Sequence, residues 1–184
     1  MNFTELKNFI QTYDNVIDGS LCDQLIEQFE SHDKKIARTQ SPMLFDEINL
    51  VREEWPVVQE LQKVIQTCSS SYRYQLNLDF AFPTKFGIEQ FRMKRYQSNR
   101  GHFDTHVDIT DYSSARRFLA FLMYLDEGEG GDTDFIDMGG ETFHTVKRKR
   151  GTVLVFPPMW MFSHRGNKPI NSAKYIISSY FHYL

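Results

Sequence analysis

The sequence predicts a mainly β fold with flanking α-helices, and three observations lead to this class. Aromatic residues make up 15% of the chain, with 16 Phe, and aromatic side chains suit pleated, half-buried surfaces. Apolar residues recur at helical spacing in the first half, and from residue 88 their spacing changes to two. A length of 184 residues suits one domain. We therefore expect a single domain over residues 1–184, with helical support over 1–87 and the β core over 88–184.

The first helix is expected over residues 20–31, "SLCDQLIEQFES". Ser20 is the expected N-cap, and Asp23, three positions on, resembles the second half of a capping box. Apolar residues then recur at the spacing of one helical face: Leu21, Leu25, Ile26 and Phe29. The pattern predicts an amphipathic helix.

The second helix is expected within residues 53–72, "EEWPVVQELQKVIQTCSSSY". Pro56 would lie in its first turn, where a missing N–H costs nothing. One face carries its apolar residues, which are Trp55, Val58, Leu61, Val64, Ile65 and Cys68. Residues 32–48, between the two helices, are polar and irregular, and we expect a mobile loop there.

Eight short segments of β character follow, separated by Gly, Asp, Asn or Pro at regular spacing. They cover residues 88–97, 101–108, 116–127, 132–138, 141–150, 151–158, 159–166 and 173–184. This pattern predicts an antiparallel sandwich or barrel. The helices would cover one face of it.

Composition narrows the class of protein. A net charge of −3 gives no electrostatic case for binding nucleic acid. Cys22 and Cys68 form neither a disulfide framework nor a CxxC pair, so we expect two reduced core thiols. The N-terminus carries early acidic residues and no long apolar run, which fits neither a signal peptide nor a membrane span. We therefore expect a cytoplasmic protein with no membrane partner; the sequence does not predict its oligomeric state.

Two overlapping His-x-Asp triplets lie in "HFDTHVD", residues 102–108. In a strand, residues i and i+2 point to the same face, so either triplet can offer two ligands to one metal. A third ligand is available from His144 or His164. Two His and one Asp would leave open positions on an octahedral metal, as in non-haem Fe(II) oxygenases. Spacing alone does not choose between the triplets.

Two other interpretations of these histidines remain open at this point. A lone His-x-Asp is more often a hydrogen-bonded pair in a polar patch. The spacing from His102 to His106 also suits a helical zinc motif, but no Glu follows the first His, as HExxH would require.

The back half, over roughly residues 88–184, resembles the prolyl 4-hydroxylase branch of the Fe(II)/2-oxoglutarate-dependent dioxygenases. The family pattern begins with Tyr, then Gly and Phe, then His-x-Asp, here Tyr96, Gly101, Phe103 and the triplet 106–108. An Arg-led apolar strand and a Gly-Gly motif follow, here "RFLAFLMYLD" and "GGDTDF". Asp126 stands where the family has Asn, and Asp132 where it has Glu. The pattern ends in His, Pro-Val and a basic residue ten positions after the His, here His164, Pro169-Ile170 and Lys174.

The resemblance implies a double-stranded β-helix core and a set of site residues. His106, Asp108 and His164 would bind Fe(II), while His102 and Asp104 become their neighbours. His144 would be a sheet-surface or pocket-lining histidine, and His32 and His182 would be structural. Lys174 would hold the far carboxylate of 2-oxoglutarate, and three further residues would lie near this cosubstrate: Tyr96, Tyr124 and Thr133.

The resemblance also implies an activity. The protein would use O2 to decarboxylate 2-oxoglutarate to succinate and CO2 while hydroxylating prolyl residues in a peptide or protein, with ascorbate keeping the iron reduced. Arg117, Arg165 and Tyr180 are the expected peptide-binding residues. The alternatives are the same chemistry on lysyl residues, a free amino acid or a small metabolite. A metal-free β-helix that serves as a binding module is the alternative outside enzymes.

Overall fold

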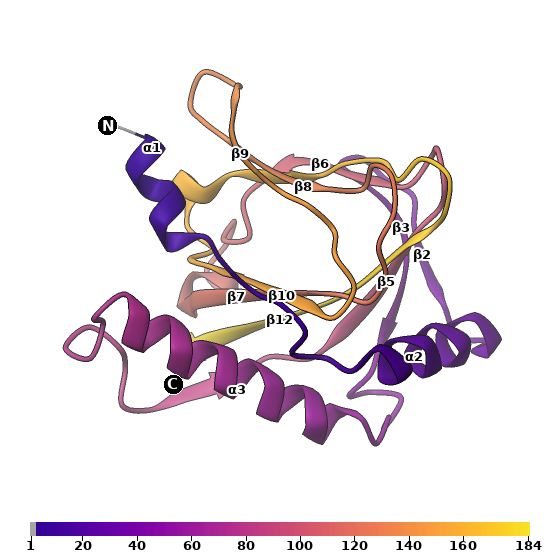
Figure 1. Cartoon of the computed structure of the whole chain (residues 1–184), viewed down its shortest axis with the longest axis horizontal. Helices are drawn as coiled ribbons and strands as arrows, with labels where there is room; N and C mark the ends of the chain where they lie inside the picture. The colour runs from indigo at the N-terminus through magenta and orange to yellow at the C-terminus, as the bar shows by residue number, and fades with distance from the viewer. Residues whose placement is uncertain (1–2) are drawn as a thin grey trace.

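Two curled layers of antiparallel strands form the body of the computed structural model, which describes residues 3–184 (Figure 1). The larger layer has the order β1 (Gln11–Tyr13), β10 (Thr152–Phe156), β7 (Arg117–Tyr124), β12 (Lys174–Tyr183), β5 (Arg92–Tyr96) and β3 (Met43–Asn49). The smaller layer continues from β3 with β6 (His102–His106), β11 (His164–Gly166), β8 (Thr133–Ile136) and β9 (Thr142–Val146). At the margins, β2 (Ile36–Arg38) pairs with β3 and β4 (Phe86–Ile88) pairs with β12. All eight segments expected to be β contain a strand.

Alternation along the large layer divides the interior into two cores. On β7, Phe121 and Met123 face the helices, whereas Leu122 and Tyr124 face the space between the layers. On β12, Ile177 and Phe181 face the helices in the same way, because side chains alternate along a strand. The large layer is therefore buried on both faces, and its inner face lines the site described below.

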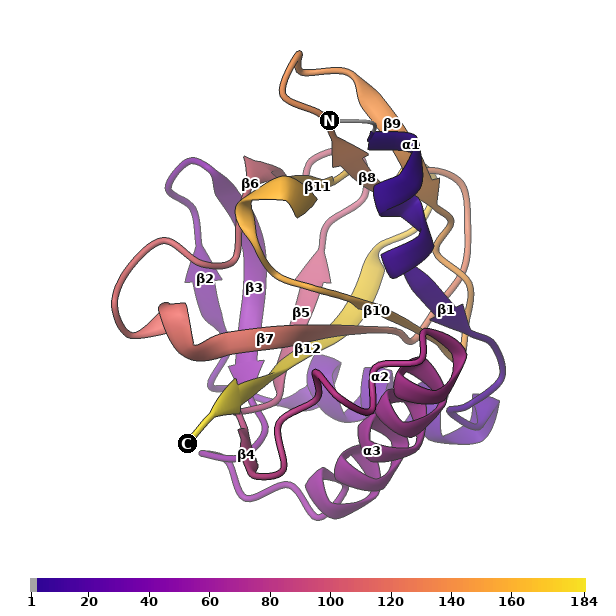
Figure 2. The same cartoon turned by 90° about the vertical axis from the view of Figure 1, so that its left-hand side faces the viewer.

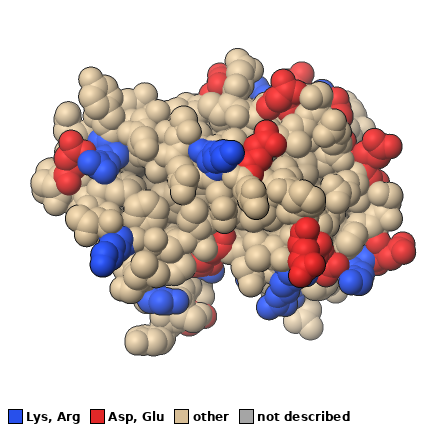
Figure 3. Space-filling model, turned by 90° about the horizontal axis from the view of Figure 1, so that it is seen from below, with Lys and Arg blue, Asp and Glu red and all other residues tan. Residues whose placement is uncertain are grey.

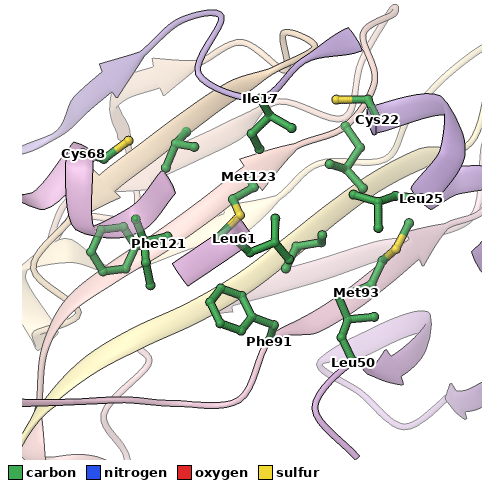
Figure 4. Packing of buried hydrophobic residues seen from close by; sticks show 14 of the residues in the cluster. Ile17, Cys22, Leu25, Leu50, Leu61, Cys68, Phe91, Met93, Phe121 and Met123 are labelled. Atoms are coloured by element: carbon green, nitrogen blue, oxygen red, sulfur yellow. The ribbon is translucent and has the colours of Figure 1, made fainter. Parts of the chain in front are cut away.

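The two long helices, α2 (Gly19–Ser31) and α3 (Val58–Gln75), cover the outer face of the large layer (Figure 2). Short helical turns are α1 (Phe3–Leu6), η1 (Lys7–Phe9), η2 (Ser114–Arg116) and η3 (Trp160–Phe162), and α1 lies beside β9 instead. Cys22 and Cys68 lie in this helix–sheet core as buried free thiols, as expected (Figure 4). On the helix-covered face, Lys and Arg lie among Asp and Glu (Figure 3).

Both helices begin differently from the prediction. Asp18 is the N-cap of α2, because its Oδ1 accepts a hydrogen bond of 2.7 Å from the Ser20 backbone N–H. Ser20 is therefore inside the helix, and it donates its hydroxyl to the same oxygen. Pro56 lies in the turn before α3, which begins at Val58.

The prediction of an irregular loop over residues 32–48 is wrong. This segment forms the hairpin of β2 and β3, and β3 then joins the two layers by pairing with β5 and with β6. The first half of the chain thus adds β1, β2 and β3 to the sheet as well as helices to its face. No helix in the described part of the chain is long and apolar enough to cross a membrane.

Candidate metal centre

Three of the predicted ligands meet at one point between the two layers. His106 ends β6, Asp108 follows two residues later, and His164 begins β11, which pairs with β6 so that the two histidines are opposite each other. Their ligand atoms all lie within 4.8 Å of one another. Each imidazole Nε2 is 3.8 Å from an oxygen of Asp108. The group therefore has the composition and spacing of a metal site.

Hydrogen bonds orient both imidazoles for metal binding. The Nδ1 atom of His106 is 2.7 Å from the Asp104 carbonyl oxygen, and that of His164 is 3.0 Å from the Phe162 carbonyl oxygen. A carbonyl only accepts, so each Nδ1 carries the proton and each Nε2 keeps a lone pair toward Asp108. The Phe103 ring stacks on His106 with centroids 3.5 Å apart and planes 9° apart.

Asp108 is held by two further side chains. Tyr180 donates a hydrogen bond of 2.8 Å to its Oδ1, and Arg117 donates one of 2.8 Å to its backbone carbonyl. The Arg117 guanidinium lies 4.1 Å from the centre of the Tyr180 ring and pairs twice with Glu89. Arg117 and Tyr180, expected to bind a peptide, thus contact Asp108.

Protonation states at the cluster also suit a cation. Burial, with His164 close by, lowers the pKa of His106 to about 3, so its imidazole is neutral at pH 7. Burial beside Asp108 raises the pKa of Tyr180 well above its usual value, so its hydroxyl stays a donor. Two histidines and one aspartate on a face match the ligand set of non-haem Fe(II). The residues present therefore fit this metal.

The first triplet does not join the cluster. The Nδ1 atom of His102 is 2.8 Å from the Arg100 carbonyl oxygen, and its Nε2 is 3.6 Å from Asp104. Both side chains line a separate hollow together with Arg165, Asn167 and Lys168.

The remaining histidines also lie outside the cluster. His144, the rival third ligand, lies beside the Phe135 ring at 6.3 Å between centroids. His32 lies 3.4 Å from Glu53, and His182 packs over Gly87.

Lys174 lies in the same cavity as the His–Asp–His cluster. It is 1% exposed and, among the residues that the structure describes, it forms neither an ion pair nor a hydrogen bond. Its ammonium group lies 5.1 Å from the centre of the Tyr96 ring and 5.6 Å from that of Tyr124. Burial lowers its pKa to about 7. An unpaired buried cation is costly, and an anion bound there would relieve the cost.

The other expected cosubstrate residues line this cavity or its wall. Thr133 faces it and accepts a hydrogen bond of 2.8 Å from the Tyr124 hydroxyl. Tyr96 faces it from β5, opposite Lys174 in the strand pairing. Gly131 has φ +73, and a Cβ there would lie 3.1 Å from the Cδ of Lys174, so this glycine makes room for the lysine stem. Geometry therefore brings all four predicted residues together.

Behind Lys174 lies a buried polar group that the sequence did not reveal. The Arg148 side chain is fully buried and donates hydrogen bonds to the Ala173 carbonyl and the Ser172 hydroxyl. It lies 3.5 Å from Asp126, whose pKa burial raises to about 6. Asp126, where the family pattern has Asn, therefore faces a guanidinium.

An open groove of about 410 Å³ adjoins the cluster. Its walls include His106, Asp108 and Tyr180, together with residues of the β2–β3 hairpin and of β5. Lys94 lines both this groove and the cavity of the cluster. No sequence motif marks Lys94, although alternation along β5 places it on the same face as Tyr96.

Arg165, the remaining residue expected to bind a peptide, is engaged elsewhere. Its guanidinium pairs with Asp134 at 2.9 Å and donates to the Thr142 hydroxyl at 3.2 Å. It lines the hollow beside His102 and Asp104. A role in substrate binding for Arg165, Arg117 and Tyr180 stays a prediction.

Comparison with known proteins places the chain in a family. A model of the 2OG-Fe(II) oxygenase superfamily matches residues 91–182, half of the chain. A PKHD-type hydroxylase of Synechococcus sp. (strain CC9311) is 35% identical over 81 residues, 42% of this chain. The chain spans only about a third of that relative's length, 34%.

Solved structures of prolyl hydroxylases share the fold. The viral collagen prolyl hydroxylase of Paramecium Bursaria Chlorella virus-1 aligns with a TM-score of 0.71, at 18% identity over 96% of each chain. A Pseudomonas putida prolyl-4-hydroxylase aligns at 0.70, with 13% identity over 99% of each. A Trichoplax adhaerens prolyl hydroxylase, solved with a hypoxia inducible factor peptide, aligns at 0.73, with 14% identity over 98% of this chain and 87% of that one.

The expected fold is therefore confirmed as a double-stranded β-helix with flanking helices. The matched region contains the whole His–Asp–His cluster and Lys174. The chain belongs to the 2OG-Fe(II) oxygenase superfamily.

Proposed function

We propose that this protein is an Fe(II)/2-oxoglutarate-dependent dioxygenase that hydroxylates prolyl residues in a peptide or protein. One observation carries the proposal: the His–Asp–His cluster lines a single cavity with the buried Lys174, which has no ion pair or hydrogen bond within residues 3–184. His106, Asp108 and His164 would hold the metal, and Lys174 would hold the far carboxylate of 2-oxoglutarate.

Fe(II), 2-oxoglutarate and O2 supply together the oxidising chemistry that yields succinate, CO2 and a hydroxylated carbon. The side chains of the protein bind and orient the cosubstrate and the substrate. The protonated Lys174 gives a compact positive charge for a carboxylate. Tyr96 and Thr133 line the same cavity, and the Tyr124 hydroxyl donates a hydrogen bond to Thr133 beside it. Leu122 and Ile176 make the wall apolar, which excludes water from the reacting centre. Ascorbate would keep the iron in its reduced state between turnovers.

The prolyl substrate is supported by two observations. The fold is that of prolyl hydroxylases from three sources, one of them solved with a peptide. The groove beside His106 is open along β2, β3 and β5 and has room for an extended chain. We further propose that residues 1–184 act as one domain, because β3 and β1 of the first half pair with β5 and β10 of the second. The expected cytoplasmic location stays a prediction.

The test is succinate formation by the purified protein with Fe(II), 2-oxoglutarate, ascorbate and O2, with and without a panel of proline-rich peptides. Peptide-stimulated succinate, together with a peptide heavier by one oxygen atom, would support the proposal. Succinate that no peptide stimulates would keep the oxygenase and contradict the prolyl peptide, directing the search to lysyl peptides and free metabolites. No succinate from protein that holds iron would contradict the oxygenase.

A further inference from the structure

Strand β5 presents a row of cations to the inside of the site. Along this strand, Met93 is buried against the helices and Arg95 pairs with Asp46 on the outside. Arg92 and Lys94, which alternate with them, line the groove beside the metal cluster. Two positive side chains therefore follow one another along the inner face, ahead of Tyr96.

Lys94 is the more deeply buried of these two cations. It is 9% exposed, and among residues 3–184 it forms no hydrogen bond or ion pair. Its ammonium group lies over two aromatic rings, 5.2 Å from the centre of Phe45 and 6.0 Å from that of Phe103. Burial lowers its pKa despite the nearby negative charges of Glu47 and Asp108. A desolvated cation of this kind is stabilised by an anion that enters the groove.

The carboxylates closest to Lys94 are already engaged. Glu47, opposite Lys94 in the strand pairing, pairs with Arg38 at 3.1 Å. Asp108 belongs to the metal cluster and accepts the hydrogen bond of Tyr180. Positive side chains outnumber negative ones among the groove residues. The positive ones are Arg38, Arg92, Lys94 and Arg117, and the negative ones are Glu47 and Asp108. Arg92 likewise has no ion pair within the described residues.

Lys94 is distinct from the lysine assigned to the cosubstrate. In the pairing of β5 with β12, Lys174 is opposite Tyr96, whereas Lys94 is opposite Ile176, two positions along the strand. Of these two lysines, Lys94 lines both the inner cavity and the open groove, whereas Lys174 lines the inner cavity alone. The site thus offers one buried ammonium at the inner end and a second where the groove enters.

We propose that Lys94, assisted by Arg92, binds a carboxylate of the substrate next to the carbon that is hydroxylated. This inference rests on the oxygenase chemistry of the proposed function and narrows the substrate to one with a carboxylate beside the target carbon. The carboxylate would be the side chain of an acidic residue beside the target in a peptide, or the α-carboxylate of a free amino acid.

The test measures binding to the full chain loaded with Mn(II) and 2-oxoglutarate, without turnover, by isothermal titration calorimetry. One pair of probes is a blocked peptide with proline flanked by Glu and the same peptide with Gln. The second pair is L-proline and L-prolinamide. In one of the two pairs, the carboxylate probe is expected to bind at least about tenfold more tightly than its amide counterpart. The pair that shows this difference identifies the carboxylate as a peptide side chain or as an α-carboxylate. Lys94→Met should reduce the preference to within about twofold, while Lys94→Arg should largely retain it.

Lys63→Met, which removes an exposed lysine of α3, is the matched control and should keep the full preference. Arg92→Gln should reduce the preference for the carboxylate probe in part. If Lys94→Met does not fold, the preference of Arg92→Gln is the test instead. The inference is overturned by no preference in either pair, or by a preference that survives Lys94→Met. It is also overturned if Lys94→Met weakens 2-oxoglutarate binding instead. Failure of the proposed function appears separately, as absent succinate formation by the iron-loaded wild type.

Discussion

At the scale of single residues, position in the strand pairing decides which His-x-Asp triplet joins the cluster, because His106 is opposite His164. His106 and His102 each approach a backbone carbonyl two residues earlier through Nδ1. Only His106 then points its Nε2 toward Asp108 and His164. The spacing in the sequence is the same for both triplets, so it could not choose between them. The resemblance to the prolyl 4-hydroxylase branch favoured the second triplet, and the geometry supplies the physical reason.

Tyr180 gives the first prediction at this scale. Tyr180→Phe removes the hydrogen bond to Asp108 Oδ1 and keeps the buried ring. Because groups that hold a metal ligand in place tune its affinity, Fe(II) or Mn(II) binding should weaken about 10- to 100-fold. Calorimetric titration with the metal measures this change. Tyr183→Phe, on the same strand but half exposed, is the control, and equal affinities in the two variants would contradict the role of Tyr180.

Lys174 gives the second prediction. Lys174→Met keeps the length of the buried side chain and removes the charge proposed to hold 2-oxoglutarate. Loss of one partner of a buried charge pair costs about 2 kcal/mol or more, so the Kd of 2-oxoglutarate should rise about 30-fold or more. Titration of the Mn(II)-loaded protein with 2-oxoglutarate checks this, with Lys63→Met as control. An unchanged Kd would mean that another residue holds the far carboxylate.

The pKa of Lys174 also predicts how stability depends on pH. Burial lowers this pKa from 10.5 to about 7, so between these values the unfolded chain binds more protons than the folded one. Stability therefore rises with pH in this window, by up to about 1.4 kcal/mol per pH unit, as the cost of burying the charge is relieved. In urea unfolding without 2-oxoglutarate, the free energy of unfolding of the wild type should rise relative to that of Lys174→Met from pH 7 to pH 9. A difference in unfolding free energy that stays constant over this pH range would contradict the lowered pKa of Lys174.

At the scale of elements, periodicity predicts the strands well and the β2–β3 hairpin poorly. Each of the eight expected segments after residue 88 contains a strand, and along β7 and β12 alternate side chains meet two different cores. The hairpin was missed because charged residues interrupt its inward face, on which Glu47 follows Met43 and Phe45. Glu47 is buried on β3, opposite Lys94 and paired with Arg38. A strand that lines a polar groove lacks the apolar alternation by which strands are recognised.

Helix α3 gives a prediction at this scale. Leu61→Ala removes a fully buried side chain from the core between α3 and the large layer. Leaving a cavity there should lower the free energy of unfolding by about 2–5 kcal/mol, whereas Lys63→Ala, on the exposed side, should change it by about 0.5 kcal/mol or less. Urea denaturation measures both. The folded Leu61→Ala protein should bind metal normally, because the helix contacts the outer face of the sheet; weakened binding at full stability would contradict this division into two cores.

At the scale of the whole molecule, the curled sheet brings residues far apart in the chain to one cavity. His106 and Asp108 come from the region of β6, His164 from β11 and Lys174 from β12. Family resemblance in the sequence predicted this set, but residues outside its motifs were not predicted. Lys94 and Arg148 acquire their positions only through strand pairing and burial, which no short motif records.

The central claim is that His106, Asp108 and His164 bind the iron of a 2-oxoglutarate oxygenase. The most direct test compares His164→Ala with His144→Ala for Fe(II) binding and for succinate formation from 2-oxoglutarate. His164→Ala should lose both, because it removes one of three ligands, and His144→Ala should keep both close to the wild type. Equal losses in the two variants, or Fe(II)-dependent succinate that persists in His164→Ala, would contradict the account.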